Sequence, residues 1–426
     1  MSLFRMLASR LGRKAPEGEV APGDAIPAVA GHADPVLTAV VVALVGFGVV
    51  MVYSASAVFA DRQFHDGHYF LIRQSIYAVL GIATMFAAAG IDYHRYRPLT
   101  YPILGITVLL LFLVGFGMGR TAGGATRWLQ IGPVNIQPAE VAKVAIIFWL
   151  AYSLSKKRDR LETFSVGFLP HALMAGFLML LCLKQPDFGS AVMIGLLTFV
   201  LMFAAGTRIG YLLGATLGVL PVLFSLVYFS EYRMERIRGF LDPFAHRQDE
   251  GFQIFESLVS FGSGGVLGVG LGDSRQKLFF LPEAHTDFIS AIVGEELGFL
   301  GILALISAFT LVVVQGYRAA FRAADDYGTY LAVGITTFVG LQAFTNLAVA
   351  MGMVPTKGLV LPFLSYGGSS LIVNCGAIGV LLNVSRPRVV AEAPQSTDST
   401  GPGATVAREK RNVARGPRNV ALGGAA

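Results

Sequence analysis

Long apolar stretches alternate with short polar segments over most of this chain. Each stretch is long enough to cross a lipid bilayer as one helix. They lie at residues 36–56, 70–91, 98–118, 137–154, 166–183, 188–206, 208–229, 289–316, 328–352 and 362–384. Only Thr207 separates the sixth stretch from the seventh, so the helix boundary there is the weakest part of the pattern. The pattern predicts an all-α polytopic membrane protein with ten transmembrane helices.

Polar segments flank and interrupt this membrane domain, which we place at residues 36–385. Residues 1–35 begin with basic side chains and continue rich in Pro, Gly and Ala, and residues 386–426 are polar and rich in the same small residues. Such segments cannot bury enough apolar surface to fold, so we expect two disordered cytoplasmic arms. The longest internal polar segment, residues 230–288, forms a large loop between the seventh and eighth helices.

The basic residues are concentrated in alternate connections, as they are on the cytoplasmic side of membrane proteins. With both chain ends in the cytoplasm, the inner connections and the tail hold Arg95, Arg97, Lys156, Lys157, Arg158, Arg160, Arg208, Arg318, Arg322, Arg386 and Arg388. The short outer connections hold fewer basic residues. A long loop is translocated whatever its charge, so the loop 230–288 is predicted to lie outside.

The composition supports the same class of protein. The chain is 54% hydrophobic and 14% charged, whereas a soluble domain is about 25% charged. The net charge of +6 does not indicate nucleic-acid binding, because most basic residues flank apolar stretches. Cys182 and Cys375 have no second cysteine or histidine at metal-ligand spacing, so two free thiols are expected. The first apolar stretch starts too far from Met1 for a cleavable signal peptide.

Ionisable residues at membrane depth are costly, which makes them candidates for function. Nearly all of them lie toward the outer ends of the predicted helices, which favours a site for a substrate at the outer leaflet over a pump or channel. Glu140 and Lys143 share a helix face and form either a structural ion pair or a wall of a substrate cavity. Asp187 either caps the next helix or lines the rim beside Lys184, which could meet a phosphate.

The large outer loop contains two further patterns. Arg233, Arg236 and Arg238 form either a solvated charged face or a set of partners for phosphate, which the planar guanidinium pairs well. The glycine-rich run 262–272 is not a nucleotide-binding loop, because no strand precedes it and no GK[ST] follows. It is predicted to be a hinge or a tight re-entrant turn.

The segment 281–298, LPEAHTDFISAIVGEELG, places Asp287 at the start of the eighth helix. Its carboxylate is either a general base or an N-cap of that helix. His285 is expected to be a hydrogen-bonded structural histidine. Glu295 would be buried further along the helix and needs a partner, for which Lys143 or an arginine is predicted.

Proline and glycine interrupt the helices again between residues 353 and 370. Irregular backbone at this depth is tolerated where protein or a wet cavity covers it. Ser365, Ser369 and Ser370 have no His or Asp partner within reach in the sequence, which disfavours a serine nucleophile.

Together these motifs resemble the SEDS family of membrane peptidoglycan glycosyltransferases (shape, elongation, division and sporulation). LPEAHTDF and PTKG favour the cell-division branch of the family over the elongation branch. Gly123–Gly124 departs from the usual Asn-Gly and puts only that loop's contacts in question. The resemblance covers residues 36–388 and is carried by Asn346 and by GATRWLQIGPVNIQPAEVAK, KQPDFGSA, YRMERIRGFLDP, the glycine run, QKLFFLPEAHTDFISAIVGEELG, VPTKG and LPFLSYGGSS.

The resemblance implies a reaction and a site. The family joins lipid II, a disaccharide-pentapeptide on undecaprenyl pyrophosphate, into β-1,4-linked glycan and releases undecaprenyl pyrophosphate. The essential acidic residue maps onto Asp287, which would take the proton of a sugar 4-hydroxyl. The residues expected to meet the pyrophosphate are Arg233, Arg236, Arg238, Lys277, Lys357 and His285. The residues expected to support the cavity are Glu140, Lys143, Lys184, Asp187, Glu295 and Ser365.

No cofactor is assigned from the sequence. A divalent cation, Mg²⁺ or Mn²⁺, could share the charge of the leaving group, although no carboxylate cluster shows clear ligand spacing.

The resemblance also implies partners and a location. The family works beside a class B penicillin-binding protein, a single-span transpeptidase, and with other division proteins. We expect its helix to dock on the eighth and ninth helices, where small residues recur. The expected location is the cytoplasmic (inner) membrane at the division septum. Two alternatives stay open: a flippase or transporter of the same lipid, which needs a polar lining through the whole membrane depth, and a non-catalytic division scaffold.

Overall fold

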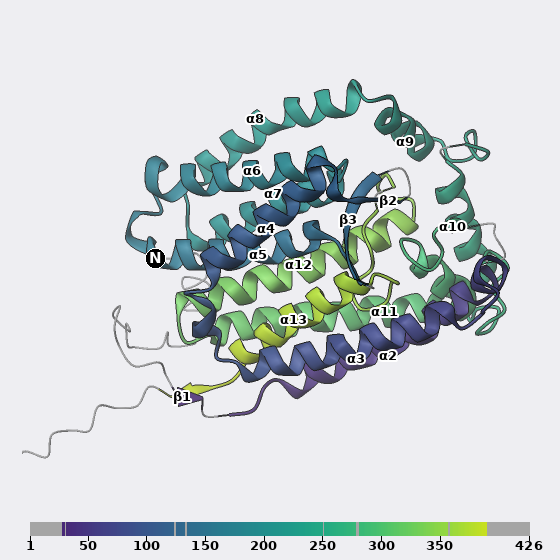
Figure 1. Cartoon of the computed structure of the whole chain (residues 1–426), viewed down its shortest axis with the longest axis horizontal. Coiled ribbons are helices and arrows are strands. Elements are labelled where there is room, and N and C mark those ends of the chain that lie inside the picture. The colour runs from purple at the N-terminus through teal and green to yellow at the C-terminus, as the bar shows by residue number, and fades with distance from the viewer. Residues whose placement is uncertain are drawn as a thin grey trace, which may run out of the picture. The chain divides into compact units, whose positions relative to one another are not determined.

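The computed structural model describes residues 28–29, 31–122, 125–132, 134–249, 251–277, 281–356 and 358–389. The predicted arms, residues 1–35 and 386–426, lie mostly outside these residues. The described part is almost entirely helical (Figure 1). Its helices are α2 (Pro35–Phe64), α3 (Tyr69–Gly90), α4 (Thr100–Leu113), α5 (Pro138–Lys156), α6 (Leu169–Lys184), α7 (Phe188–Ala205), α8 (Ile209–Tyr228), α9 (Glu231–Leu241), α10 (Phe252–Gly264), α11 (Ile289–Arg322), α12 (Asp326–Ala350) and α13 (Gly368–Val384).

The polytopic membrane fold predicted from the apolar pattern is confirmed. Among the described residues, nine helices are long and apolar enough to cross a membrane. They are α2 to α8, α11 and α12, with α4 extended by a π-helical turn to Met118 and α6 preceded by one from Phe164. The tenth predicted stretch contains α13, a shorter apolar helix of 17 residues. The count of ten spans stays a prediction.

The start of α2 shows how the sequence fixes a helix end. Asp34 is the N-cap, and its Oδ1 accepts from the backbone N–H groups of Val36 (2.9 Å) and Leu37 (3.0 Å). Pro35 follows at the first helical position, where it has no hydrogen bond to lose. The cap satisfies donors that a helix start leaves unpaired, so the first span begins at a defined residue.

The two ends of the described chain meet. Strand β1 (Ala28–Val29) pairs with strand β5 (Arg388–Val389), and the backbone N–H of Asp34 donates to Ser385 Oγ at 3.1 Å. In Figure 1, β1 lies at the opposite end of the helices from α9 and α10. The chain therefore enters α2 and leaves α13 at the same end.

Charged side chains tie the connections together at that same end. His94 Nδ1 lies 2.6 Å from Asp92 Oδ1, and its Nε2 lies 3.1 Å from Asp325 Oδ2. Arg388 Nη1 donates to Asp92 Oδ2 at 2.5 Å, and the Tyr93 hydroxyl donates to Asp325 Oδ1 at 2.9 Å. Burial alone would raise the pKa of each aspartate, but these bonds hold both pKa values below the ordinary range. Three connections of the chain are thus linked by ionised groups.

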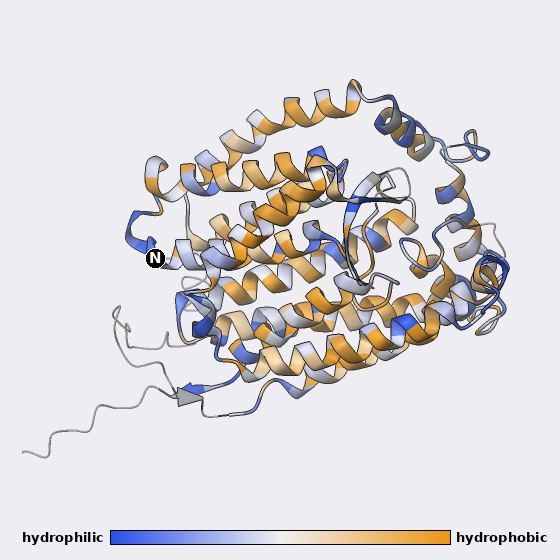
Figure 2. Cartoon of the chain, in the orientation of Figure 1, coloured by the Kyte–Doolittle hydropathy of each residue, from blue (hydrophilic) through white to orange (hydrophobic). Residues whose placement is uncertain are grey.

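Close backbone approach joins the first and last parts of the bundle. α3 and α13 pack along their length, and a Cβ at Gly379 would stand 2.2 Å from the carbonyl oxygen of Met85. Only glycine allows that approach. Figure 2 shows hydrophobic residues along the helices and hydrophilic ones gathered at the two ends, as a membrane-embedded bundle requires.

Two features at the outer end are absent from the apolar pattern. The connection between α4 and α5 folds into an antiparallel sheet of β2 (Arg120–Ala122), β3 (Ala125–Ile131) and β4 (Val134–Ile136). The large loop contains the helices α9 and α10. In Figure 1 the sheet and both helices lie at the end opposite β1.

Candidate functional site

Asp287 lies in the turn that leads into α11. The N-cap of this helix is Phe288, and within the described part of the chain no side chain caps it. The alternative that Asp287 is a helix cap is therefore wrong. The carbonyl oxygen of Asp287 accepts from Asn346 Nδ2 of α12 at 2.7 Å, and the same Nδ2 donates to the carbonyl of Leu359 at 2.8 Å. One amide thus fastens the turn to the loop after α12.

A second segment braces the same turn. Ser365 Oγ donates to the carbonyl of Thr286 at 2.6 Å and accepts from the backbone N–H of Leu361 at 2.8 Å. The backbone N–H of Tyr366 donates to the carbonyl of His285 at 2.9 Å. Ser365 therefore positions the turn through hydrogen bonds to its backbone. These bonds use backbone atoms of the turn and leave the carboxylate of Asp287 available for chemistry.

The carboxylate and a guanidinium converge on one glycine. A Cβ placed on Gly358 would lie 3.4 Å from Asp287 Oδ2 and 3.2 Å from Arg127 Nη1. Gly358 is exposed and Asp287 is partly exposed. The absence of a side chain at residue 358 thus leaves an open approach to both groups.

The electrostatic environment sets the charge of Asp287. Burial raises the pKa of Asp287 to about 7, and the negative charges of Glu283 and Asp187 act in the same direction. The positive charges of Arg127 and Arg236 oppose this rise. A carboxyl with a pKa near the working pH can both accept and return a proton, which is the property of a general base.

His285 lies in an aromatic cluster. Its ring centroid is 4.6 Å from that of Phe70, 5.6 Å from that of Phe59 and 5.9 Å from that of Tyr366. Burial lowers the pKa of His285, so the ring is neutral at neutral pH. The histidine packs the base of the turn, and its predicted contact with phosphate stays a prediction.

The three arginines of α9 differ in their surroundings. Arg236 Nη1 donates to the carbonyl of Thr356 at 3.2 Å, which brings it to the loop that carries Gly358. Arg233 Nη1 donates to the carbonyl of Leu226 at 2.7 Å, and Arg238 is exposed. Arg236 is thus the member of the set that acts on Asp287. The predicted binding residue Lys357 lies outside the described residues.

Lys277 forms an ion pair with Glu296. Its Nζ lies 3.1 Å from Glu296 Oε1 and 3.4 Å from Ser54 Oγ. Its side chain is 8% exposed and that of Glu296 is fully buried. A buried pair of this kind is costly to break. Lys277 therefore links the large loop to α11 and α2, and its contact with a phosphate stays a prediction.

The predicted cavity residues near α5 and α7 make structural contacts. Lys143 Nζ lies 2.6 Å from Glu140 Oε1 and both side chains are buried. The structure thus contains the ion pair of the first alternative. Asp187 is the N-cap of α7, and its Oδ1 accepts from the backbone N–H of Ser190 at 3.0 Å. Lys184 is exposed, with Nζ 3.6 Å from the ring centroid of Phe116.

The partner predicted for Glu295 is wrong. Its carboxylate accepts from Ser274 Oγ and from the backbone N–H groups of Arg275 (3.0 Å) and Gln276 (3.4 Å), rather than from Lys143 or an arginine side chain. The reason is that the glycine-rich run folds back onto α11. The backbone N–H of Val269 donates to the carbonyl of Glu295 at 3.0 Å. Residues 262–264 of the run end α10, and the rest of the run is a tight turn packed on α11, as predicted.

Two residues of the site, Arg127 and Gly358, are not predicted from the sequence. Arg127 belongs to the motif GATRWLQIG and is a basic residue in a short outer connection, where such residues are scarce. That scarcity is the one signal that could have identified it. Gly358 lies within VPTKG, where a glycine is indistinguishable from an ordinary loop residue.

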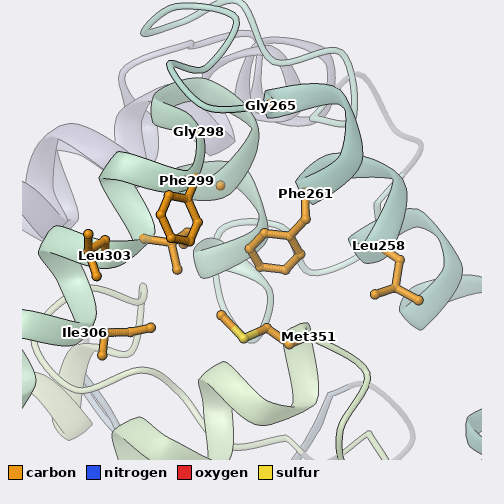
Figure 3. A pocket seen from close by; sticks show the side chains of 10 residues that line it. Leu258, Phe261, Gly265, Gly298, Phe299, Leu303, Ile306 and Met351 are labelled. Carbon is orange, nitrogen blue, oxygen red and sulfur yellow. The ribbon is translucent and has the colours of Figure 1, made fainter.

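An apolar cavity of about 310 Å³ lies beside α11, between it and α10. Figure 3 shows Phe261 and Leu258 of α10, Phe299 and Leu303 of α11, and Met351 around it. Gly298, where α11 is kinked with φ 66°, also lines the cavity. A cavity lined by apolar side chains suits an apolar side chain or an acyl chain.

Metal ligands are not clustered in the described ranges: no group of three or more His, Cys, Asp or Glu side chains there could hold a metal ion. We assign no step to a metal. The divalent cation stays a prediction.

Comparison with known proteins gives consistent results. The family model described as "Cell cycle protein" (FtsW, RodA, SpoVE) matches residues 35–389. "Probable peptidoglycan glycosyltransferase FtsW" of Geobacter metallireducens is 50% identical over 353 residues, covering 83% of this chain and 94% of the relative. "Stage V sporulation protein E" of Bacillus subtilis is 42% identical over 357 residues, covering 83% and 97%.

Solved structures are similar over the same region. One, described as "Structural coordination of polymerization and crosslinking by a peptidoglycan synthase complex", matches with a TM-score of 0.69 at 30% identity, covering 83% of this chain and 97% of that one. The rod shape determining protein RodA of Thermus thermophilus matches with a TM-score of 0.63 at 29% identity, covering 84% and 98%.

Proposed function

This chain belongs to the SEDS family of FtsW, RodA and SpoVE cell cycle proteins, and we propose that it acts as a peptidoglycan glycosyltransferase with Asp287 as its general base. The relatives named FtsW and the peptidoglycan synthase structure support this activity. They do not favour the flippase or the scaffold.

The observation that carries the mechanism is the state of Asp287. Its backbone is fastened by Asn346, the residue is partly exposed, and its pKa is raised to about 7. In the proposed reaction, the carboxylate takes the proton of an acceptor sugar 4-hydroxyl of lipid II. The hydroxyl oxygen forms a bond to the donor's anomeric carbon. The bond from that carbon to the phosphate oxygen breaks, and undecaprenyl pyrophosphate leaves with the electron pair.

The leaving pyrophosphate concentrates negative charge, which fixed cations stabilise. Of the predicted cations, Arg236 lies nearest to this role, because its side chain donates to the carbonyl of Thr356 in the loop that carries Gly358. Arg238 is exposed and also remains available to this proposal. The contacts of Lys277 and Arg233 favour a structural role for those two side chains.

We place the site at the outer face of the cytoplasmic membrane, with both chain ends in the cytoplasm. The residues around Asp287 come from predicted outer connections, whereas Arg97, Arg158 and Arg388 lie in ion pairs at the opposite end. This separation agrees with the bias of basic residues toward the cytoplasm. The FtsW relatives favour a role at the division septum.

The proposed partner is a class B penicillin-binding protein that docks on the outer half of α11. Phe299 is 59% exposed and Leu303 is 47% exposed, beside the apolar cavity of Figure 3. A transmembrane helix presents apolar side chains of matching size. A Leu303→Cys variant should form a disulfide cross-link with a cysteine placed along the partner's transmembrane helix. If no position on that helix cross-links, this docking surface is contradicted.

The function is tested with Asp287→Asn, reconstituted in liposomes with the transpeptidase and lipid II. The variant should insert and bind its partner but make no glycan, because the amide cannot accept the proton. Asp273→Asn is the matched control, since Asp273 is an exposed carboxylate of the same loop. Glycan made by Asp287→Asn at the wild-type rate would remove Asp287 from the chemistry.

A further inference from the structure

We infer that Arg127 is a positioning residue of this site, whose guanidinium is held at the Pro186 turn and keeps the Asp287 carboxylate ionised and directed toward the opening at Gly358. This inference rests on the proposed function, because it concerns how the base is kept ready. It adds a residue that the sequence patterns do not assign to any role.

The side chain of Arg127 is held by the connection between α6 and α7. Arg127 lies on β3, and its Nη2 donates to the carbonyl of Pro186, in the turn between α6 and α7, at 2.6 Å. The next residue, Asp187, caps α7 and accepts from Gln137 Nε2 at 3.3 Å. The guanidinium is therefore fixed between two outer connections that are themselves tied to helix ends.

The free side of the guanidinium faces the base. Arg127 Nη1 and Asp287 Oδ2 lie 3.2 Å and 3.4 Å from the position of a Cβ on Gly358. The two groups cannot be farther apart than the sum of these distances. At such a separation a cation stabilises a carboxylate, and more so in a partly buried site than in water.

Four charged groups of the described neighbouring segments act on the pKa of Asp287, two in each direction. Glu283, from the preceding turn, and Asp187, from α7, favour the protonated form. Arg236, from α9, and Arg127, from the sheet, favour the ionised form. Arg236 spends Nη1 on the carbonyl of Thr356. Arg127 instead directs Nη1 at the opening itself.

The consequence for activity has a clear sign. A general base works only when ionised, so polymerisation is lost as pH falls through the pKa of Asp287, about 7. Removing the Arg127 charge raises that pKa further, because an opposite charge at this range typically lowers a carboxyl pKa by about 1 unit or more. The acid limb of the pH profile therefore moves to higher pH.

The test uses the full-length protein with its transpeptidase and measures two quantities against pH. The first is glycan formed from lipid II. The second is labelling of Asp287 by a hydrophobic carbodiimide, which reacts with the protonated carboxyl and is quantified by mass spectrometry. Arg127→Gln should move both midpoints from about 7 to about 8. Arg120→Gln, in the exposed part of β2, is the matched control and should leave both unchanged.

Unchanged midpoints in Arg127→Gln, or an equal shift in Arg120→Gln, would overturn the inference. Where Arg127→Gln makes no glycan at any pH, the labelling curve decides. If that variant does not give monodisperse protein, Arg127→Lys is decisive. The lysine keeps the charge but cannot hold Pro186 and face Gly358 at once, so glycan synthesis should fall at an unchanged midpoint. Wild-type synthesis by Arg127→Lys would refute the positioning role.

The two proposals fail in different ways. If Asp287→Asn polymerises normally, the general-base function fails, while the carbodiimide curve of Arg127→Gln still reports whether Arg127 controls Asp287.

Discussion

At the scale of single residues, a specific prediction follows from the fact that residue 358 is a glycine. Alanine there would place a Cβ 3.2 Å from Arg127 Nη1 and 3.4 Å from Asp287 Oδ2. The contact with Arg127 Nη1 is tighter than most Cβ contacts, so the guanidinium must shift by a few tenths of an ångström, whereas the contact with Asp287 Oδ2 is ordinary. Because catalytic geometry tolerates little displacement, glycan synthesis should fall by roughly tenfold or more. Gel-based measurement of glycan made by the reconstituted Gly358→Ala protein checks this.

The control for this substitution is Gly105→Ala in α4, where an added Cβ meets nothing within 4 Å. Alanine within a helix should leave both synthesis and folding intact. The melting temperature of Gly358→Ala should also match that of the wild type, because residue 358 is exposed. Full synthesis by Gly358→Ala would mean that the approach to Asp287 does not pass over Gly358.

Residue identity alone could predict Asp287 but not its surroundings. An acidic residue at the start of a membrane helix stands out because burying it is costly. The partners of Glu295 could not be predicted, since two of its three donors are backbone N–H groups, which every sequence offers equally. Arg127 was missed for a related reason. Its place beside Asp287 depends on how separate outer connections fold against one another, which no local pattern encodes.

At the scale of elements, the glycine-rich run gives a matched pair of substitutions. Gly268 and Gly272 both have positive φ, 82° and 88°. A Cβ at Gly268 would lie 2.1 Å from the carbonyl oxygen of Glu296, whereas one at Gly272 meets nothing within 4 Å. Alanine at either residue costs about 1–2 kcal/mol of backbone strain. Gly268→Ala should cost about 1–3 kcal/mol more, because the turn must separate from α11.

Thermal unfolding of both variants in detergent checks this difference. Gly268→Ala should also reduce glycan synthesis more than Gly272→Ala, because Glu295 and Glu296 hold the loop that the turn supports. Equal melting temperatures for the two variants would show that close packing of the turn against α11 does not contribute to stability.

The long helices could be predicted because a run of apolar residues has few alternatives in a bilayer. Most of their observed bounds follow the predicted stretches closely. The exceptions are α2, which continues to Phe64, α11, which continues to Arg322, and α13, which begins only at Gly368. The sheet β2–β4 and the helices α9 and α10 could not be predicted in this way. They lie outside the apolar stretches, where neither hydrophobic period nor length constrains the fold.

At the scale of the whole membrane unit, the chemistry divides between two ends. One end holds Asp287 with the partners that tune it. The other holds the network of Asp92, His94, Asp325 and Arg388. α13 begins near the Ser365 segment and ends at Val384, shortly before Arg388, and so connects the two. The described chain also enters and leaves the bundle at the same end, which predicts an even number of membrane crossings.

This even number makes the topology testable. With nine long apolar helices among the described residues, we predict that α13 crosses as well. Lys157, after α5, and Gln248, in the large loop, should then face opposite sides of the membrane. Single cysteines at these two residues, in a background without Cys182 and Cys375, are treated in intact cells with a reagent that does not cross the inner membrane. Gln248 should be labelled and Lys157 should be labelled only after permeabilisation. Labelling of both cysteines in intact cells would exclude this topology and place Asp287 on an unassigned side, since its turn follows the same loop.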